Sequence, residues 1–126
     1  MRFKGAAVAV IIAALGASRA YADGEGDATS GEAAFKKNCS VCHTTEAGKN
    51  KIGPSLNGVV GRQSASIAGF AYSDAMKKAD KTWDEATLKI YLTNPRELVP
   101  GTKMVFLGLK NDADRSNVIA YLKSLN

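Results

Sequence analysis

Histidine and cysteine are scarce in this chain of 126 residues, which has one histidine, His43, and two cysteines, Cys39 and Cys42. Two cysteines cannot build a disulfide framework, although export would allow one bond between them. A structural zinc site normally needs four cysteine or histidine ligands, and this chain does not have that many. No apolar run reaches the length of about 20 residues that spans a membrane, so the sequence predicts no stable membrane insertion.

The first 22 residues have the pattern of a secretory signal peptide. Two positive charges precede an apolar run over residues 5–18, and the Ala-Tyr-Ala triplet ending at Ala22 supplies the small residues that a signal peptidase reads. We therefore predict cleavage after Ala22, a mature domain of residues 23–126 and a periplasmic location. The alternative is that the apolar run is retained as a membrane anchor, for which it is short.

The net charge of +5 gives no support to nucleic-acid binding. Three of the 17 basic residues lie in the predicted leader, which leaves 14 basic against 12 acidic residues and a mature charge of +2. Nucleic-acid-binding domains usually carry a clustered basic stripe. The mature chain is long enough for one domain, but it is small for a self-sufficient core. An additional stabilising element is therefore expected, and a large buried cofactor would provide one.

Capping patterns and apolar periodicity predict an all-helical domain with long loops. A threonine followed three residues later by glutamate marks a helix start, as at Thr29 and Thr82. Residues 44–71 contain five glycines and are expected to be loop, which is unusual in a small domain unless the loop wraps a bound group. Residues 98–109 are also expected to be loop. The predicted helices start at Thr29, Ser73, Thr82 and Asn111 or Asp112, and the first three end near Cys42, Ala79 and Pro95. The predicted inward residues are Phe35, Cys39 and Cys42, then Ala86, Leu88, Tyr91 and Leu92, and finally Val118, Ile119, Leu122 and Leu125.

One motif carries specific chemistry, the segment Cys39-Ser40-Val41-Cys42-His43. On a helix, the two cysteines and the histidine four residues after the first would project from one face. This spacing is typical of c-type haem attachment, with two thioether bonds and one bond from imidazole to iron. There are three alternatives. The cysteines could form a redox dithiol, but this needs a thioredoxin-like βαβ context. They could also be half of a zinc site, or the match could be accidental in a packed helix.

A haem that carries electrons needs a second axial iron ligand, and the chain has no second histidine. A methionine thioether is the natural candidate. Met1 leaves with the leader and Met76 lies in a predicted helix, whereas Met104 lies in a loop that could cross the opposite face of the haem. We predict Met104 as the ligand, although a loop methionine is ordinarily an apolar filler.

Residues 30–126 resemble the class I cytochromes c, close to bacterial cytochrome c2 and mitochondrial cytochrome c. The resemblance implies an all-α cytochrome c fold, with helices wrapped around one covalently attached haem c and long connecting loops. It also implies a monomeric electron carrier that is not an enzyme. The matching stretches are CSVCH at 39–43, KIGP at 51–54, GR at 61–62, GFAY at 69–72, TW at 82–83, Tyr91, NP at 94–95, PGTKM at 100–104 and AYL at 120–122.

The resemblance implies a role for each residue expected around the haem. Pro54 should present its carbonyl to His43 and so fix the imidazole. Tyr91 should lie beside the Met104 sulfur, and Phe106 over the haem edge. Arg62, Tyr72 and Trp83 match residues that hydrogen-bond or neutralise the haem propionates, although Trp83 and Tyr91 equally fit ordinary core positions. Gly31 and Phe35 should pack against Tyr121 and Leu122 where the terminal helices cross.

Some positions depart from the family pattern. Met76 stands where the family commonly has asparagine, which puts a polar network near the haem in doubt. Asn38 and Glu97 stand where many relatives have lysine, so the rim of the haem crevice is predicted to be less positive. The basic rim positions that match are Lys51, Arg96, Lys103 and Lys110.

With both axial positions filled by protein, the predicted function is outer-sphere transfer of single electrons through an exposed haem edge. The carrier would serve membrane or periplasmic redox complexes in a respiratory or photosynthetic chain, such as a bc1-type complex, a terminal oxidase or a reaction centre. Docking through the basic rim is expected to be weak and steered by charge. The alternative is a haem enzyme or gas-binding haem protein in which Met104 is displaceable.

Overall fold

The computed structural model describes residues 26–126, and within this range the chain is helical with no strand. The all-helical expectation is therefore confirmed for this part of the chain, where a single isolated bridge joins Gln63 and Thr82. No helix among these residues is both long and apolar enough to cross a membrane. The predicted leader lies outside the described residues, so cleavage after Ala22 stays a prediction. The helices are α1 (Ala28–Asn38), α2 (Asp74–Ala79), α3 (Glu85–Thr93), α4 (Pro95–Leu98) and α5 (Asp112–Lys123).

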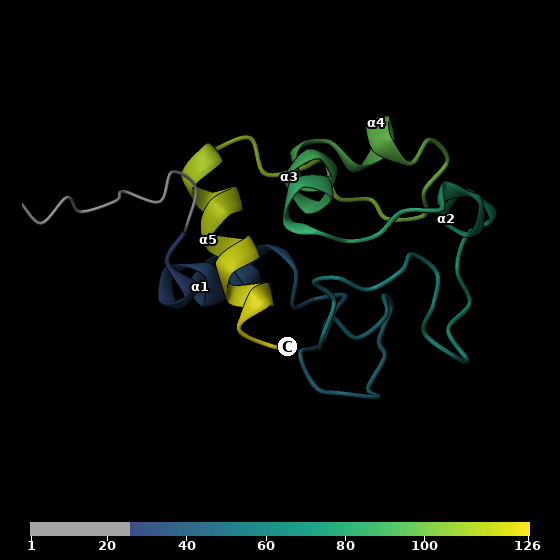
Figure 1. The fold of residues 1–126 in the computed structure, drawn as a ribbon, viewed down its shortest axis with the longest axis horizontal. Coiled ribbons are helices and arrows are strands. Elements are labelled where there is room, and N and C mark those ends of the chain that lie inside the picture. Colours follow the sequence, from purple (N-terminus) through teal and green to yellow (C-terminus); the bar gives the residue numbers. More distant parts are fainter. Residues whose placement is uncertain (1–25) are drawn as a thin grey trace, which may run out of the picture.

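The first and last helices cross and pack against each other, as Figure 1 shows for α1 and α5. The ring centroids of Phe35 and Tyr121 lie 5.5 Å apart at this crossing. A Cβ atom at Gly31 would lie 1.8 Å from the carbonyl oxygen of Asn117, so only glycine lets the two backbones approach this closely. The predicted contact of Gly31 and Phe35 with Tyr121 is thus confirmed, and Leu122 is buried in the same core cluster as Phe35.

Two predicted helix starts are wrong by two residues. The N-cap of α1 is Asp27, whose carboxylate accepts a hydrogen bond from the Ser30 N–H, and Thr29 lies inside the helix. The N-cap of α3 is Asp84, which accepts from the Thr87 N–H, rather than Thr82. Aspartate and threonine are both good caps, so the sequence alone did not distinguish them. The predicted caps Ser73 of α2 and Asn111 of α5 are confirmed.

The haem-attachment motif lies in a turn after α1, which corrects the predicted helix through Cys42. The helix ends at Asn38, and the carbonyl of Phe35 accepts from the N–H groups of both Cys39 and Ser40. Because two donors share this acceptor, the regular i to i−4 pattern stops there. The chain then makes another turn, closed by a 2.9 Å bond from the His43 N–H to the Cys39 carbonyl.

Long irregular segments separate α1 from α3, as predicted, and only the short helix α2 interrupts them (Figure 1). The C-terminal end of the chain is hydrogen-bonded to the first of these segments, since the Gly58 N–H donates to the Leu125 carbonyl at 3.2 Å. Helix α3 ends at Thr93, before Pro95, as predicted. The short helix α4 was not predicted, and Pro95 is its first residue.

The apolar core lies among α1, α3, α5 and the loops that join them. Most of the predicted inward residues are buried there. Ala86 is an error, since it is exposed on α3, and Leu125 is only partly buried. The buried apolar side chains are Phe35, Val59, Trp83, Leu88, Tyr91, Leu92, Val99, Leu109, Val118, Ile119 and Leu122.

Candidate functional site

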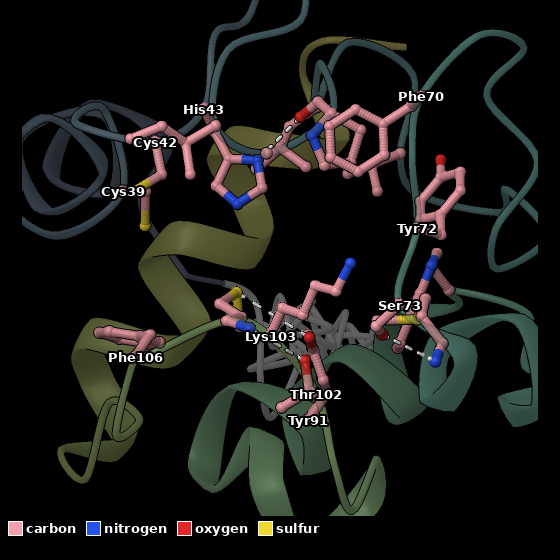
Figure 2. A pocket seen from close by; sticks show the side chains of 18 of the residues that line it. Cys39, Cys42, His43, Phe70, Tyr72, Ser73, Tyr91, Thr102, Lys103 and Phe106 are labelled. Atoms are coloured by element: carbon pink, nitrogen blue, oxygen red, sulfur yellow. Dashed lines mark hydrogen bonds between the residues drawn. The ribbon is translucent and has the colours of Figure 1, made fainter.

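A cavity of about 480 Å³ opens between the turn after α1, the long loop before α2, helix α3 and the loop after α4. Its volume is within the range of about 300–1,000 Å³ that is typical of cofactor sites. Figure 2 looks into this cavity, with the cysteines and His43 on one side and Tyr91 and Thr102 on another. All ten predicted site residues line it: Cys39, Cys42, His43, Pro54, Arg62, Tyr72, Trp83, Tyr91, Met104 and Phe106.

Cys39 and Cys42 are free thiols that lie beside His43 at one end of the cavity (Figure 2). Both side chains are partly buried. Burial raises the pKa of Cys39 to about 11, with a smaller contribution from Cys42. The Cys39 thiol is therefore protonated at neutral pH and is not a reactive thiolate, which disfavours the redox-dithiol alternative.

His43 is held as a neutral imidazole with one nitrogen free. Its Nδ1 lies 2.8 Å from the carbonyl oxygen of Pro54, as predicted. Because a carbonyl only accepts, Nδ1 carries the proton in this bond, and Nε2 keeps its lone pair. Burial also lowers the pKa of His43, which favours the neutral form. The lone pair of Nε2 is therefore available to bind a metal ion.

Met104 lines the cavity beside Tyr91, which Figure 2 shows across the cavity from His43. Its sulfur lies 3.9 Å from the Tyr91 hydroxyl. The Met104 N–H donates to the Thr102 hydroxyl at 3.2 Å, which fixes the loop that carries the sulfur. Burial raises the pKa of Tyr91, so its hydroxyl remains a donor at neutral pH. The expected neighbourhood of Tyr91 and the Met104 sulfur is confirmed.

Arg62, Tyr72 and Trp83 are fixed where they line the cavity. Arg62 donates to the carbonyl of Ser55 at 2.8 Å and also to the carbonyl of Asn57. The Tyr72 hydroxyl accepts from the Ile67 N–H at 3.1 Å. Trp83 packs against Tyr91, with ring centroids 4.7 Å apart. Polar and aromatic groups therefore line a cavity that is mostly apolar.

Several cavity residues were given no role from the sequence. Phe70 packs edge to face on Tyr72, with ring centroids 4.8 Å apart, and Thr102 positions Met104. Gly53 lies directly against His43. Phe70 and Thr102 contact residues two positions away, and Gly53 contacts a residue ten positions earlier. All three lie outside the helices, where apolar periodicity assigns no role to a single residue.

The residues around the cavity fit a covalently attached haem. They provide two thiols in the attachment spacing, an imidazole with a free Nε2, a thioether and apolar walls. They do not fit a zinc site, because no group of three or more histidine, cysteine, aspartate or glutamate side chains comes together within residues 26–126.

Comparison with known proteins agrees with this chemistry. The cytochrome c family matches residues 28–126. The chain is 59% identical over 87 residues to cytochrome c2 iso-2 of Magnetospirillum fulvum, covering 69% of this chain and 91% of that protein. It is 52% identical over 118 residues to cytochrome c2 of Rhodomicrobium vannielii, covering 90% and 94%. It is also 52% identical over 99 residues to cytochrome c of Gossypium barbadense, covering 78% and 89%.

The match covers nearly all of the residues that the structure describes, including the whole cavity. The two cysteines and the histidine that line the cavity have the spacing typical of c-type haem attachment. The chain therefore belongs to the cytochrome c family: it is an electron carrier rather than an enzyme, and it carries one covalently attached haem c.

Proposed function

We propose that this chain is a periplasmic one-electron carrier, with haem bonded to Cys39 and Cys42 and with iron ligated by His43 and Met104. One observation carries the proposal: an imidazole with a free Nε2 and a thioether line the same cavity, and the thioether lies beside Tyr91, across the cavity from the imidazole in Figure 2. No second histidine competes for the position opposite His43.

The bound haem would supply an iron that gains or loses one electron. His43 and Met104 would occupy both axial positions, which leaves no coordination position for a substrate. The Pro54 carbonyl keeps the imidazole in one tautomer and one orientation. A thioether ligand and apolar surroundings both disfavour the ferric charge, so the residues of this cavity favour a high reduction potential.

The remaining cavity residues are proposed to bind the rest of the cofactor. Arg62, Tyr72 and Trp83 provide donors for the two propionates. Burial lowers the pKa of Arg62, but a guanidinium remains charged at neutral pH and can offset a carboxylate. Phe106 is partly buried on the cavity wall and would cover the haem edge.

The proposed docking surface is the basic rim of Lys51, Arg96, Lys103 and Lys110, all of which are exposed. Apolar side chains lie next to two of these lysines, since Ile52 and Val105 are 76% and 78% exposed. Exposed basic side chains with exposed apolar neighbours suit brief encounters that are steered by charge. The proposed partners are a bc1-type complex and a terminal oxidase or reaction centre, served by a monomer.

Substitution of the two cavity methionines tests the ligation. The ferric protein is expected to show the near-red absorption band of a thioether–iron bond. Met104→Ala should abolish this band and let the reduced protein bind carbon monoxide rapidly, because one axial position opens. Met76→Leu is the matched control, since Met76 lines the same cavity and the change conserves volume. A band that survives in Met104→Ala, or disappears in Met76→Leu, contradicts ligation by Met104.

A further inference from the structure

Gly53 lies against the face of the imidazole of His43. A Cβ atom built at Gly53 would lie 2.3 Å from Cε1, 2.7 Å from Nδ1 and 2.8 Å from Nε2 of that ring. Real Cβ atoms essentially never come within 3.0 Å of a non-bonded heavy atom. Three ring atoms at similar distances mean that the smallest side chain would overlap the ring itself.

The backbone of Gly53 does not explain why this position is glycine. Six glycines of the described chain have positive φ values, and Gly53 is not among them. Its φ is therefore not in the left-handed region that favours glycine. The contact with His43 is therefore the structural reason for the absence of a side chain.

Neither partner in this contact can move away easily. The Gly53 N–H donates to the Cys42 carbonyl at 2.7 Å, and the Gly53 carbonyl accepts from the Lys51 N–H at 2.9 Å. The next residue, Pro54, binds Nδ1 of the same imidazole. The ring is thus held at its edge by one residue and at its face by the residue before it.

We propose that Gly53 is a positioning residue that sets the plane of the His43 imidazole relative to the haem. The Pro54 carbonyl fixes where Nδ1 points but leaves the ring free to rock about that bond. Contact with the bare Cα of Gly53 removes this freedom on one face. The inference rests on the proposed ligation of iron by His43.

The orientation of the imidazole plane is measurable without an activity assay. In a ferric low-spin haem, the unpaired electron is distributed over the porphyrin according to the planes of its axial ligands. The NMR shifts of the four haem methyl groups therefore report the direction of the imidazole plane. A rotated ring changes the order or spread of these four resonances.

The test compares Gly53→Ala with Gly58→Ala in the haem-loaded protein. Gly58 has a φ of +68° and nothing within 4 Å of its hypothetical Cβ, so alanine there strains the backbone without touching His43. Both variants should have lower thermal midpoints. Only Gly53→Ala should change the pattern of haem methyl shifts, and an unchanged pattern in that variant overturns the inference.

A second measurement applies if Gly53→Ala does not accumulate with haem. In the reduced, diamagnetic wild-type protein, a strong nuclear Overhauser effect is expected between an α-hydrogen of Gly53 and Hε1 of His43. Its absence contradicts the contact. If instead the wild-type protein shows no imidazole–iron spectrum at all, then the proposed ligation fails rather than the role of Gly53.

Discussion

Single residues tune the site through contacts with the two proposed iron ligands. The Tyr91 hydroxyl is directed at the Met104 sulfur, and the Pro54 carbonyl at the imidazole of His43. A donor to the sulfur withdraws electron density from the thioether, which makes it a poorer partner for ferric iron. Such contacts adjust the potential without changing the ligands themselves.

Tyr91→Phe is therefore expected to lower the reduction potential. Loss of one weak hydrogen bond changes the free energy by at most about 1 kcal/mol, which corresponds to about 40 mV for one electron. An optical redox titration measures the shift. Tyr121→Phe is the control, because Tyr121 packs on Phe35 rather than in the cavity, and it should leave the potential unchanged. An equal or higher potential in Tyr91→Phe would show that the hydroxyl does not act on the sulfur.

The sequence predicted the cavity residues well because the motif and the resemblance placed them in order along the chain. All ten predicted residues line the cavity. Gly53 was missed as a positioning residue, although its neighbour Pro54 was predicted. Its role arises from the approach of one loop to the ring of another residue, which no local pattern encodes.

Among the elements, helix positions followed from the sequence more reliably than helix starts. The N-terminal residues of α1 and α3 each contain an aspartate and a threonine close together, and in both cases the aspartate is the cap. Glu32, which suggested a capping box with Thr29, pairs with Lys36 at 2.9 Å. The cysteine motif was expected on a helix, but a turn brings both thiols to the cavity equally well.

Substitutions at the start of α1 distinguish the two possible caps. Asp27→Ala should lower the thermal midpoint, because the Ser30 N–H loses its acceptor and α1 frays beside α5. Thr29→Ala should change the midpoint little, since Thr29 is exposed inside the first turn. Thermal unfolding followed by circular dichroism measures both. A larger loss in Thr29→Ala than in Asp27→Ala would restore the capping box that the sequence suggested.

The cap of α3 is expected to make stability depend on pH in acid. The backbone N–H of Thr87 holds the pKa of Asp84 below its ordinary value of 3.8. The charged carboxylate therefore stabilises the fold above about pH 4, and this contribution is lost as the pH falls through the lowered pKa.

Asp84→Asn should distinguish the stabilisation by the capping hydrogen bond from the stabilisation by the carboxylate charge. Asparagine keeps an oxygen for the Thr87 N–H but does not titrate, so the neutral midpoint should change little and the loss in acid should become shallower. Asp84→Ala should lower the midpoint at neutral pH as well. Denaturant titrations at several pH values measure this, and identical acid profiles for wild type and Asp84→Asn would exclude a contribution from Asp84.

For the whole molecule, the distribution of charge matters more than its sum. The mature chain would have a net charge of only +2, so attraction to a partner depends on where the lysines lie. Lys103 borders the cavity, whereas Lys89 is exposed on α3 and does not. A local positive field at the haem crevice would steer encounters even in a nearly neutral protein.

Lys103→Glu is expected to slow reduction by an anionic reagent such as ferrocyanide at low ionic strength, and to flatten the dependence of this rate on salt. Lys89→Glu makes the same change in net charge away from the cavity and should have a smaller effect. Stopped-flow kinetics over a range of salt concentrations measures both rates. Equal slowing by the two variants would mean that net charge, rather than the rim, controls the encounter.

The apolar core and the cavity share many of the same side chains. A domain of this size has little core, and six of the eleven buried apolar side chains also line the cavity: Val59, Trp83, Leu88, Tyr91, Leu92 and Leu122. The sequence predicted this arrangement in outline, since the long loops of residues 44–71 suggested a bound group. Helix α4 and the exposure of Ala86 were not foreseen, because both depend on how α3 packs.

Intact-mass spectrometry of the purified protein, before and after extraction with acidified acetone, tests the central claim most directly. The account predicts the mass of residues 23–126 plus one haem, unchanged by extraction, because Cys39 and Cys42 hold the cofactor through covalent thioether bonds. A chain that loses the haem to the solvent, or that has only the mass of the polypeptide, would contradict it.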